Sequence, residues 1–194
     1  MADVRTIRDM HGRVTSKCVM SDCGLYRYRL ERRWDPSLPA AGFALCNPST
    51  ADAFVDDATM RKCVGFAKRW GCGGIVIVNV CAFRSPNPEA LLPATDPVGP
   101  DNREALQQLA EDWHHYHANK HDPESTAADG VSVIVAGWGG ALPKRLEEHA
   151  ETALGWLIGA DVHCLGRTKA DRPRHPLMLP YDTELEVYVR RKAA

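Results

Sequence analysis

The sequence has neither a large excess of charge of one sign nor a hydrophobic run long enough to cross a bilayer. Its 194 residues carry a formal net charge of -1, so total charge gives no sign of nucleic-acid binding. A membrane helix needs about 20 consecutive apolar residues, and no stretch reaches that length. The first residues also lack the apolar stretch of a secretory signal. Together these absences predict a cytoplasmic protein with no membrane partner.

Cysteines are few and are not paired by their spacing. An odd, scattered set predicts reduced thiols in a core rather than a disulfide framework. Cys18 and Cys23 are too far apart for a Cys-x-x-Cys hook, and no second pair follows to complete a zinc or iron–sulfur site. The seven cysteines lie at positions 18, 23, 46, 63, 72, 81 and 164.

Familiar cofactor motifs are also missing. The glycine-rich stretch 71–74 precedes an apolar segment instead of following one, so it is neither a dinucleotide fingerprint nor a phosphate loop. His114, His117 and His121 follow a helical spacing, but no cysteine or carboxylate of known register accompanies them. A solvated helix end is the expected reading, and a metal-dependent hydrolase is the weakest alternative. We therefore expect no cofactor and no bound metal.

Short apolar segments alternate with helical patterns along the chain. This alternation predicts an α/β fold with three α/β/α layers around a mostly parallel, four-stranded central sheet. The expected strands are 43–46, 75–81, 131–136 and 162–165, and the expected helices are 58–70, 101–116 and 144–157. We expect one domain over residues 1–194. It is divided into an irregular extension (1–24), an edge strand (25–34), the core (41–180) and a C-terminal segment (181–194).

Polar residues mark the ends of three of the expected strands. Asn47 precedes Pro48 directly after the first strand, Asn79 interrupts the second, and His175 follows the fourth. Parallel strands place their carboxyl ends at one edge of a sheet, where ligands bind in open α/β folds. The three side chains are therefore expected to converge on one pocket. Taken alone, each has a structural explanation as a turn residue or a satisfied buried amide.

The same motifs, in the same order, resemble those of the uracil-DNA glycosylase superfamily. The matching segments are Ala44-Leu-Cys-Asn-Pro-Ser49, Ile75-Val-Ile-Val-Asn79 and Arg174-His-Pro-Leu177, with Gly-Trp-Gly after the third strand. The chain also resembles a bacterial and phage-associated family of unknown function, typified by Asn-Pro-Ser-Thr-Ala-Asp and Pro-Arg-His-Pro-Leu. The resemblance implies a glycosylase fold over residues 41–180.

The resemblance also implies roles for individual residues. Asn47 would position the attacking water, Asn79 would bind the Watson–Crick edge of a flipped base, and His175 would donate to the base carbonyl that gains charge. The strict uracil enzymes carry a catalytic Asp where this chain has Asn47. The missing carboxylate is assigned to Asp52, with Asp56 and Asp57 as alternatives, although Asp52 could equally cap the following helix.

Further residues near these motifs are assigned to the base and to DNA. Phe54 would stack on the base, and the small Ser49 and Thr50 would leave room for an enlarged one. Leu177 or Met178 would fill the space that the base leaves in the duplex. The sequence also has two groups of basic residues. The group after the fourth strand would hold phosphates; it consists of Arg167, Lys169, Arg172 and Arg174. The group nearer the N-terminus is expected to be a solvated face; it consists of Arg27, Arg29, Arg32 and Arg33.

The expected function is therefore hydrolysis of the N-glycosidic bond of a modified, enlarged pyrimidine in DNA, leaving an abasic site, in antiviral defence. DNA is the expected partner and a monomer the expected state. Two alternatives use the same fold: a non-catalytic reader of modified DNA, and an enzyme acting on free nucleotides or on a base-modification intermediate.

Overall fold

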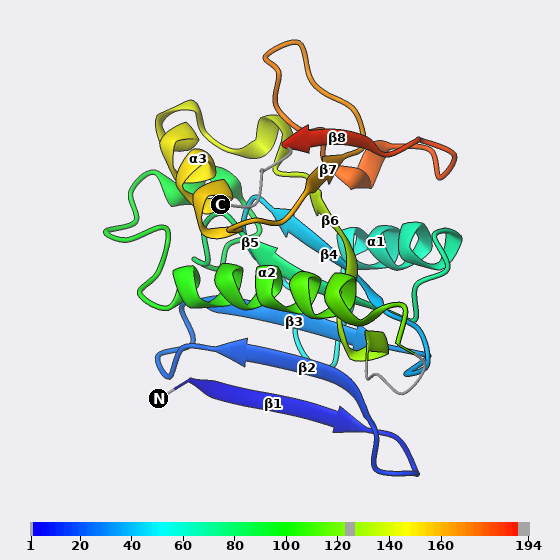
Figure 1. Ribbon diagram of the computed structural model, residues 1–194. Coiled ribbons are helices and arrows are strands. Elements are labelled where there is room, and N and C mark those ends of the chain that lie inside the picture. Colours follow the sequence, from blue (N-terminus) through cyan, green and yellow to red (C-terminus); the bar gives the residue numbers. More distant parts are fainter. Residues whose placement is uncertain (1, 123–126, 190–194) are drawn as a thin grey trace.

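A mixed eight-stranded sheet, in the order β1-β2-β3-β5-β4-β6-β7-β8, forms the centre of the protein (Figure 1). The computed structural model describes residues 2–122 and 127–189. The strands are β1 (Asp3–Arg8), β2 (Val14–Met20), β3 (Arg27–Arg33), β4 (Ala40–Leu45), β5 (Gly74–Asn79), β6 (Val131–Ala136), β7 (Val162–Cys164) and β8 (Glu186–Val189).

The four strands expected from the sequence form the parallel part of this sheet. β4 lies between β5 and β6 and is parallel to both, and β7 continues the parallel set beside β6. Every residue of β4 and β5 is buried. Both strands are continuously apolar over most of their length because each of their faces is covered. The parallel core is confirmed, and its strands end at one edge.

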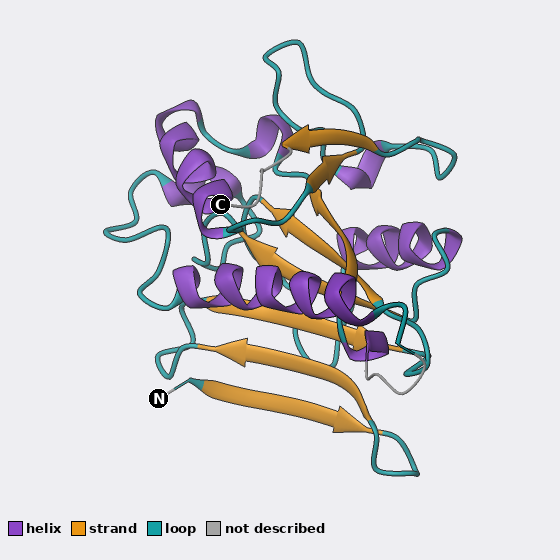
Figure 2. Ribbon diagram, in the orientation of Figure 1, coloured by secondary structure: helices purple, strands orange, loops and turns teal. Residues whose placement is uncertain are grey.

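Helices cover both faces of the sheet, so the expected three layers are confirmed (Figure 2). α1 (Ala58–Arg69) packs on one face through Met60, Cys63 and Phe66, which belong to the same core as Phe43 of β4. α2 (Asn102–Asn119) and α3 (Glu147–Trp156) share the other core. Each helix begins within three residues of its expected start.

The predictions for the N-terminal third were wrong in three respects. Residues 1–24 are not an irregular extension, because β1 and β2 form an antiparallel hairpin within them. β3 is not an edge strand, since it lies between β2 and β5. The sheet has eight strands rather than four. Polar β1 gave no apolar signal because it is itself the edge and most of its residues face solvent. β8 adds the opposite edge within the expected C-terminal segment, and residues 190–194 lie outside the described residues.

Two expectations drawn from composition can be compared with the structure. All seven cysteines are free thiols, and Cys23 alone among them is exposed, which confirms the prediction of reduced core thiols. Within residues 2–122 and 127–189, no helix is long and apolar enough to cross a membrane.

Asn102 fastens the beginning of α2 to the end of β5. Its side chain is fully buried, and its Nδ2 donates to the carbonyls of Asn79 and Val80, both at 3.0 Å. Both carbonyls lie at the end of β5, where the strand leaves the sheet. Asp101 precedes it at the expected N-cap position, but its side chain makes no capping hydrogen bond. The amide of Asn102 therefore fixes the position of the helix.

Replacing Asn102 by alanine should lower the free energy of unfolding by about 2–3 kcal/mol, because it removes two hydrogen bonds from a buried side chain to backbone carbonyls. The measurement is urea denaturation, with an unchanged m-value expected. Asn119→Ala is the matched control, since its amide donates to His115 at the exposed end of the same helix and should change stability by less than about 0.5 kcal/mol. Equal effects of the two substitutions would contradict this account of α2.

Candidate functional site

The three polar features at the strand ends line one pocket. Asn47, Asn79 and His175 surround a cavity of about 40 Å³ at the carboxyl edge of the parallel strands, on the α1 side of the sheet. Arg27 of β3 and Asp57, at the start of α1, line the same cavity. The convergence expected from a parallel sheet is therefore present in the structure.

Asn79 carries the clearest chemical signal in the pocket. The residue is 1% exposed, and neither Oδ1 nor Nδ2 has a hydrogen-bond partner within the described residues. A buried amide without partners costs roughly 1–3 kcal/mol for each unsatisfied group. Its backbone is held by β4 and by Asn102, so the side chain is not needed for the fold. The carboxamide is thus a free donor and a free acceptor side by side, facing a cavity.

The carboxamide of Asn47 is fixed by its surroundings. Its Nδ2 donates to the carbonyls of Ser85, at 2.8 Å, and of Pro48, at 3.1 Å. Both donor hydrogens are thereby used, which leaves Oδ1 as an acceptor for a water molecule or a ligand. Because Ser85 belongs to the loop after β5, this contact also joins the ends of β4 and β5.

His175 reaches the pocket because glycines let its loop approach the end of β6. A Cβ on Gly137 would lie 2.9 Å from Cδ of Pro176, and one on Gly139 would lie 3.0 Å from Cβ of His175. Gly139 also has a φ of +61°, which disfavours other residues. The Gly-Trp-Gly sequence after the third parallel strand is therefore explained by close packing against the His-Pro loop.

The imidazole of His175 is neutral and has a defined tautomer. Its Nδ1 accepts a hydrogen bond from the backbone N–H of Leu177, so the ring proton lies on Nε2. Burial lowers the pKa of His175 below its ordinary value of 6.5, and the nearby carboxylate of Asp57 opposes this only in part. At neutral pH the ring is thus an uncharged hydrogen-bond donor.

Arg27 is a pocket residue that the sequence analysis placed on a solvated face, and that expectation was wrong. It is 4% exposed, and the one hydrogen bond of its side chain within the described residues runs from Nη1 to the carbonyl of Ala51. Its Nε is buried without a partner. Burial lowers the pKa of Arg27 to about 10, so it remains a cation at neutral pH. A buried cation with so few partners is suited to an anionic ligand.

The other members of that arginine group have partners within the protein. Arg29 contacts Glu31 and Asp112, and Arg32 contacts Asp56. The alternation of Arg27, Arg29 and Glu31 with apolar residues suggested that one face of this strand is exposed to solvent. β3 instead lies inside a sheet covered on both sides, so the period of two reported the strand correctly but gave no measure of exposure.

Of the three candidate carboxylates, Asp57 is the one that lines the pocket. It also caps α1, because it accepts the backbone N–H of Met60 at 2.7 Å. Asp52 does not cap the helix; it accepts the backbone N–H groups of Phe54 and Val55, which lower its pKa. Asp56 pairs with Arg32. The structure therefore brings Asp57, and not Asp52, to Asn47 and His175.

The remaining expected base-binding residues are divided between the pocket and the surface. Ser49 lines the cavity, as does Thr59 of α1. Thr50 is exposed and does not line it. Phe54 is 69% exposed and lies outside the cavity, on the loop between β4 and α1. In this structure Phe54 is thus a surface aromatic rather than a wall of the pocket.

The basic loop after β7 is less available to phosphates than its composition suggested. Arg167 pairs with Asp171 and Glu186, and Arg172 contacts Glu147 and the carbonyl of Leu142. These contacts shape the loop itself. Lys169 and Arg174 are exposed, and neither has an ion pair within residues 2–122 and 127–189. Leu177 and Met178, in a single turn that begins at Pro176, are 36% and 86% exposed.

Two histidines of α2 contact backbone carbonyls. His114 contacts the carbonyl of Ile158 through Nε2, while His117 contacts that of Ser132. No group of three or more His, Cys, Asp or Glu side chains suitable for a metal occurs among the residues that the structure describes.

Comparisons with known proteins bear on the whole of this site. The model of a family described as "Protein of unknown function (DUF1643)" matches residues 27–177. This range includes all five polar residues considered above as the site: Arg27, Asn47, Asp57, Asn79 and His175. No curated protein and no solved structure matches the chain. The chain therefore belongs to the family described as Protein of unknown function (DUF1643).

Proposed function

We propose that this protein is a DNA glycosylase of the uracil-DNA glycosylase type, hydrolysing the N-glycosidic bond of a modified pyrimidine to leave an abasic site. The observation that carries the proposal is the carboxamide of Asn79, buried with both polar atoms unpartnered in the cavity that Asn47 and His175 share. A pyrimidine presents adjacent donor and acceptor atoms on its Watson–Crick edge. A fixed amide is complementary to such an edge, and its unsatisfied groups would gain partners when the base binds.

In the proposed reaction, the bond between C1′ and the base nitrogen breaks and its electron pair leaves with the base. The sugar becomes oxocarbenium-like, as in other glycoside hydrolysis. The neutral His175 would donate its Nε2 hydrogen to the carbonyl oxygen on which negative charge grows. Arg27 adds a cation at the same pocket, and its unpartnered Nε gives it a free donor for the departing anion. Two donors thus favour the charged leaving group over the neutral base.

Water must then attack C1′ and lose a proton. The free Oδ1 of Asn47 would orient this water, and Asp57 would accept its proton as general base. Asp57 replaces Asp52 in the proposal because it lines the cavity, whereas the Asp52 carboxylate is used by the turn at Phe54. The products are the free base and an abasic sugar.

The size of the pocket constrains how a base enters. A volume of about 40 Å³ holds about three water molecules, which is too little for an enlarged pyrimidine. The walls formed by Ser49 and Ala51, on the loop after β4, have to move outward for such a base. The exposed Leu177 and Met178, which follow His175 directly, would occupy the space that the base leaves in the duplex. Excision of hypermodified bases would serve antiviral defence.

One observation favours a second candidate, an enzyme acting on free nucleotides. Arg27 is a buried cation with an unpartnered Nε, and a phosphate group would satisfy it as well as an anionic base does. Such an enzyme would act on mononucleotides and would show little salt-dependent affinity for DNA.

The proposed activity is tested with unmodified, uracil-containing and hypermodified phage DNA, measuring abasic sites and released base. Asp57→Asn and Asn47→Ala should lower the single-turnover rate at least about 100-fold, because each removes a group that handles the water. Asp56→Asn is the matched control, since its carboxylate pairs with Arg32 outside the pocket. Binding of modified DNA without release of a base would indicate a reader, and release from mononucleotides alone would indicate the second candidate. Activity on none of these substrates would reject the proposal.

Replacing Asn79 by leucine, which is similar in size, should separate stability from activity. The variant loses the edge-reading amide, so base release should become undetectable. It also removes two buried polar atoms that have no partners, and the free energy of unfolding should rise by about 1–3 kcal/mol. Chemical denaturation and the abasic-site assay measure the two effects. A loss of stability of the same size would show that the amide has a structural role.

The pH dependence of the single-turnover rate should identify the form of His175 that acts. Burial lowers its pKa, so the rate should be constant above the ordinary value of 6.5 and fall only at more acidic pH, as the ring becomes charged. Protonation at Nδ1 also breaks the hydrogen bond from Leu177. His175→Gln keeps a donor that does not titrate, and its slower rate should lose this acidic decline. A wild-type rate that increases as the pH falls would instead indicate a cationic histidine acid.

A further inference from the structure

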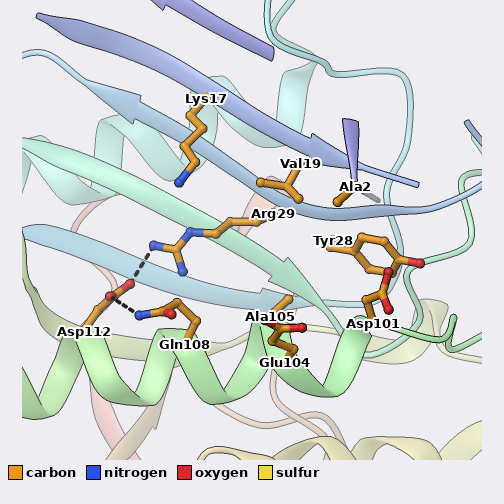
Figure 3. Close-up of a pocket in the computed structure, with 10 residues that line it drawn as sticks. All are labelled: Ala2, Lys17, Val19, Tyr28, Arg29, Asp101, Glu104, Ala105, Gln108 and Asp112. Carbon is orange, nitrogen blue, oxygen red and sulfur yellow. Dashed lines mark hydrogen bonds and ion pairs between the residues drawn. The ribbon is translucent and has the colours of Figure 1, made fainter. Parts of the chain in front are cut away.

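A second hollow, larger than the pocket described above, is a groove of about 770 Å³ beside α2 (Figure 3). Its walls are formed by residues of β2 and β3, by one side of the helix and by Ala2. Tyr28 and Ala105, which line it, belong to the core on the α2 side of the sheet. Met60 and Ile77, which line the smaller pocket, belong to the core on the other side. The two sites therefore lie on opposite faces of the sheet.

Charge is separated along the groove. Lys17 and Arg29 lie at one end, with Asp112 paired to Arg29, and Asp101 and Glu104 lie at the other (Figure 3). Glu104 and Asp112 are eight positions apart on α2, so the groove extends about 12 Å along the helix. This length and a volume within the usual range for small-molecule sites fit an elongated ligand rather than a compact ion.

The cationic end keeps one donor group free. Arg29 uses Nε for Glu31 and Nη2 for Asp112, while its Nη1 is buried without a hydrogen-bond partner. Lys17 lies beside it, and its Nζ is 3.8 Å from Glu31, which is too long for a strong hydrogen bond. An acceptor group of a ligand would satisfy Nη1 and bind close to the ammonium of Lys17.

The acidic end is also incompletely satisfied. Tyr28 is 2% exposed, and its buried hydroxyl lies close to the carboxylate and backbone of Asp101 but has no partner at full hydrogen-bond geometry within the described residues. Burial, with the nearby carboxylate of Asp101, raises the pKa of Tyr28 to about 12, so the hydroxyl stays protonated. Asp101 makes no capping hydrogen bond, and neither it nor Glu104 has an ion pair within the described residues. Acidic residues are favourable near a helix N-terminus, which accounts for the presence of Asp101 and Glu104 there. It does not account for the buried hydroxyl of Tyr28.

We propose that this groove binds a short zwitterionic molecule, with the dimensions of a tri- or tetrapeptide that has free ends. Its ammonium group lies against Asp101, Glu104 and the hydroxyl oxygen of Tyr28. Its carboxylate lies against Nη1 of Arg29 and Nζ of Lys17. Four extended residues span about 13 Å, which matches the separation of the two charged ends. This site is independent of the proposed glycosylase activity.

The probe is tetraglycine with free ends, titrated into the isotope-labelled full-length protein and followed by NMR. We expect saturable shifts for residues of β2, β3 and the first two turns of α2, with a Kd on the order of 1 mM or tighter. Tetraglycine acetylated at its N-terminus or amidated at its C-terminus should bind about tenfold more weakly in each case, because each loses one charge-assisted contact. Absence of saturable shifts, or equal binding of the blocked peptides, would overturn the proposal.

Variants locate the two ends of the ligand. Glu104→Gln should weaken tetraglycine binding about tenfold and leave the affinity for the acetylated peptide unchanged. Lys17→Gln should weaken tetraglycine binding about tenfold and leave the affinity for the amidated peptide unchanged. Glu111→Gln, on an exposed side of the same helix, is the matched control and should change neither affinity. Loss of binding in that control would overturn the assignment.

Tyr28→Phe tests the role of the hydroxyl in a variant that keeps the fold. Removing a buried hydroxyl that lacks a partner should raise the melting temperature of the free protein, while tetraglycine binds several-fold more weakly. Unchanged binding would exclude the hydroxyl from the site. Binding of a linear diamine or a dicarboxylate as tightly as tetraglycine would also contradict a site built for both charges.

Discussion

The attachment of Asn102 to the end of β5 is the contact on which both sites depend. Its amide satisfies the carbonyls of Asn79 and Val80, while the N–H of Val80 donates to Leu45 of β4. The backbone at this edge is therefore fixed without help from the side chain of Asn79. That side chain is free to face the pocket, and the same contact sets where α2 begins and thus where Asp101 lies. One buried amide in this way defines a wall of each site.

β3 joins the two sites through consecutive residues. Side chains alternate between the faces of a strand, so Arg27 and Tyr28 point to opposite sides of the sheet. Arg27 lines the pocket beneath α1, and Tyr28 lines the groove beside α2. Both are almost fully buried and both retain an unpartnered polar atom. A ligand bound as proposed on either face would contact a residue whose chain neighbour lines the other site.

The sequence was sufficient for those features that depend on local pattern and chain order. Continuous apolar runs identified β4 and β5, and parallel topology then brought Asn47, Asn79 and His175 to one edge. Features that depend on which faces are covered could not be found in this way. The period-two pattern around Arg27 is the same for a strand with one solvent-exposed face and for a strand in the interior of a sheet that is covered on both faces. The sequence also could not show which of Asp52, Asp56 and Asp57 lines the pocket. That depends on a short loop in which Asp52 accepts the N–H of Phe54 and Asp57 accepts the N–H of Met60 at the start of α1.

The buried polar atoms of this fold include some that have hydrogen-bond partners and some that have none. Some buried polar side-chain atoms have partners, as Oγ of Ser16 does with the carbonyl of Ala53 and Nδ2 of Asn102 does with β5. Unpartnered atoms of Asn79, Arg27, Tyr28 and Arg29 line the two hollows, whereas Nε of Arg84 and Oδ1 of Asn102 are unpartnered at positions that line neither. Each lowers the stability of the free protein, since a buried group without a partner keeps its desolvation cost. Packing of apolar residues in two cores offsets that cost. The four unpartnered groups that line the hollows are the ones to which the two proposals assign ligands.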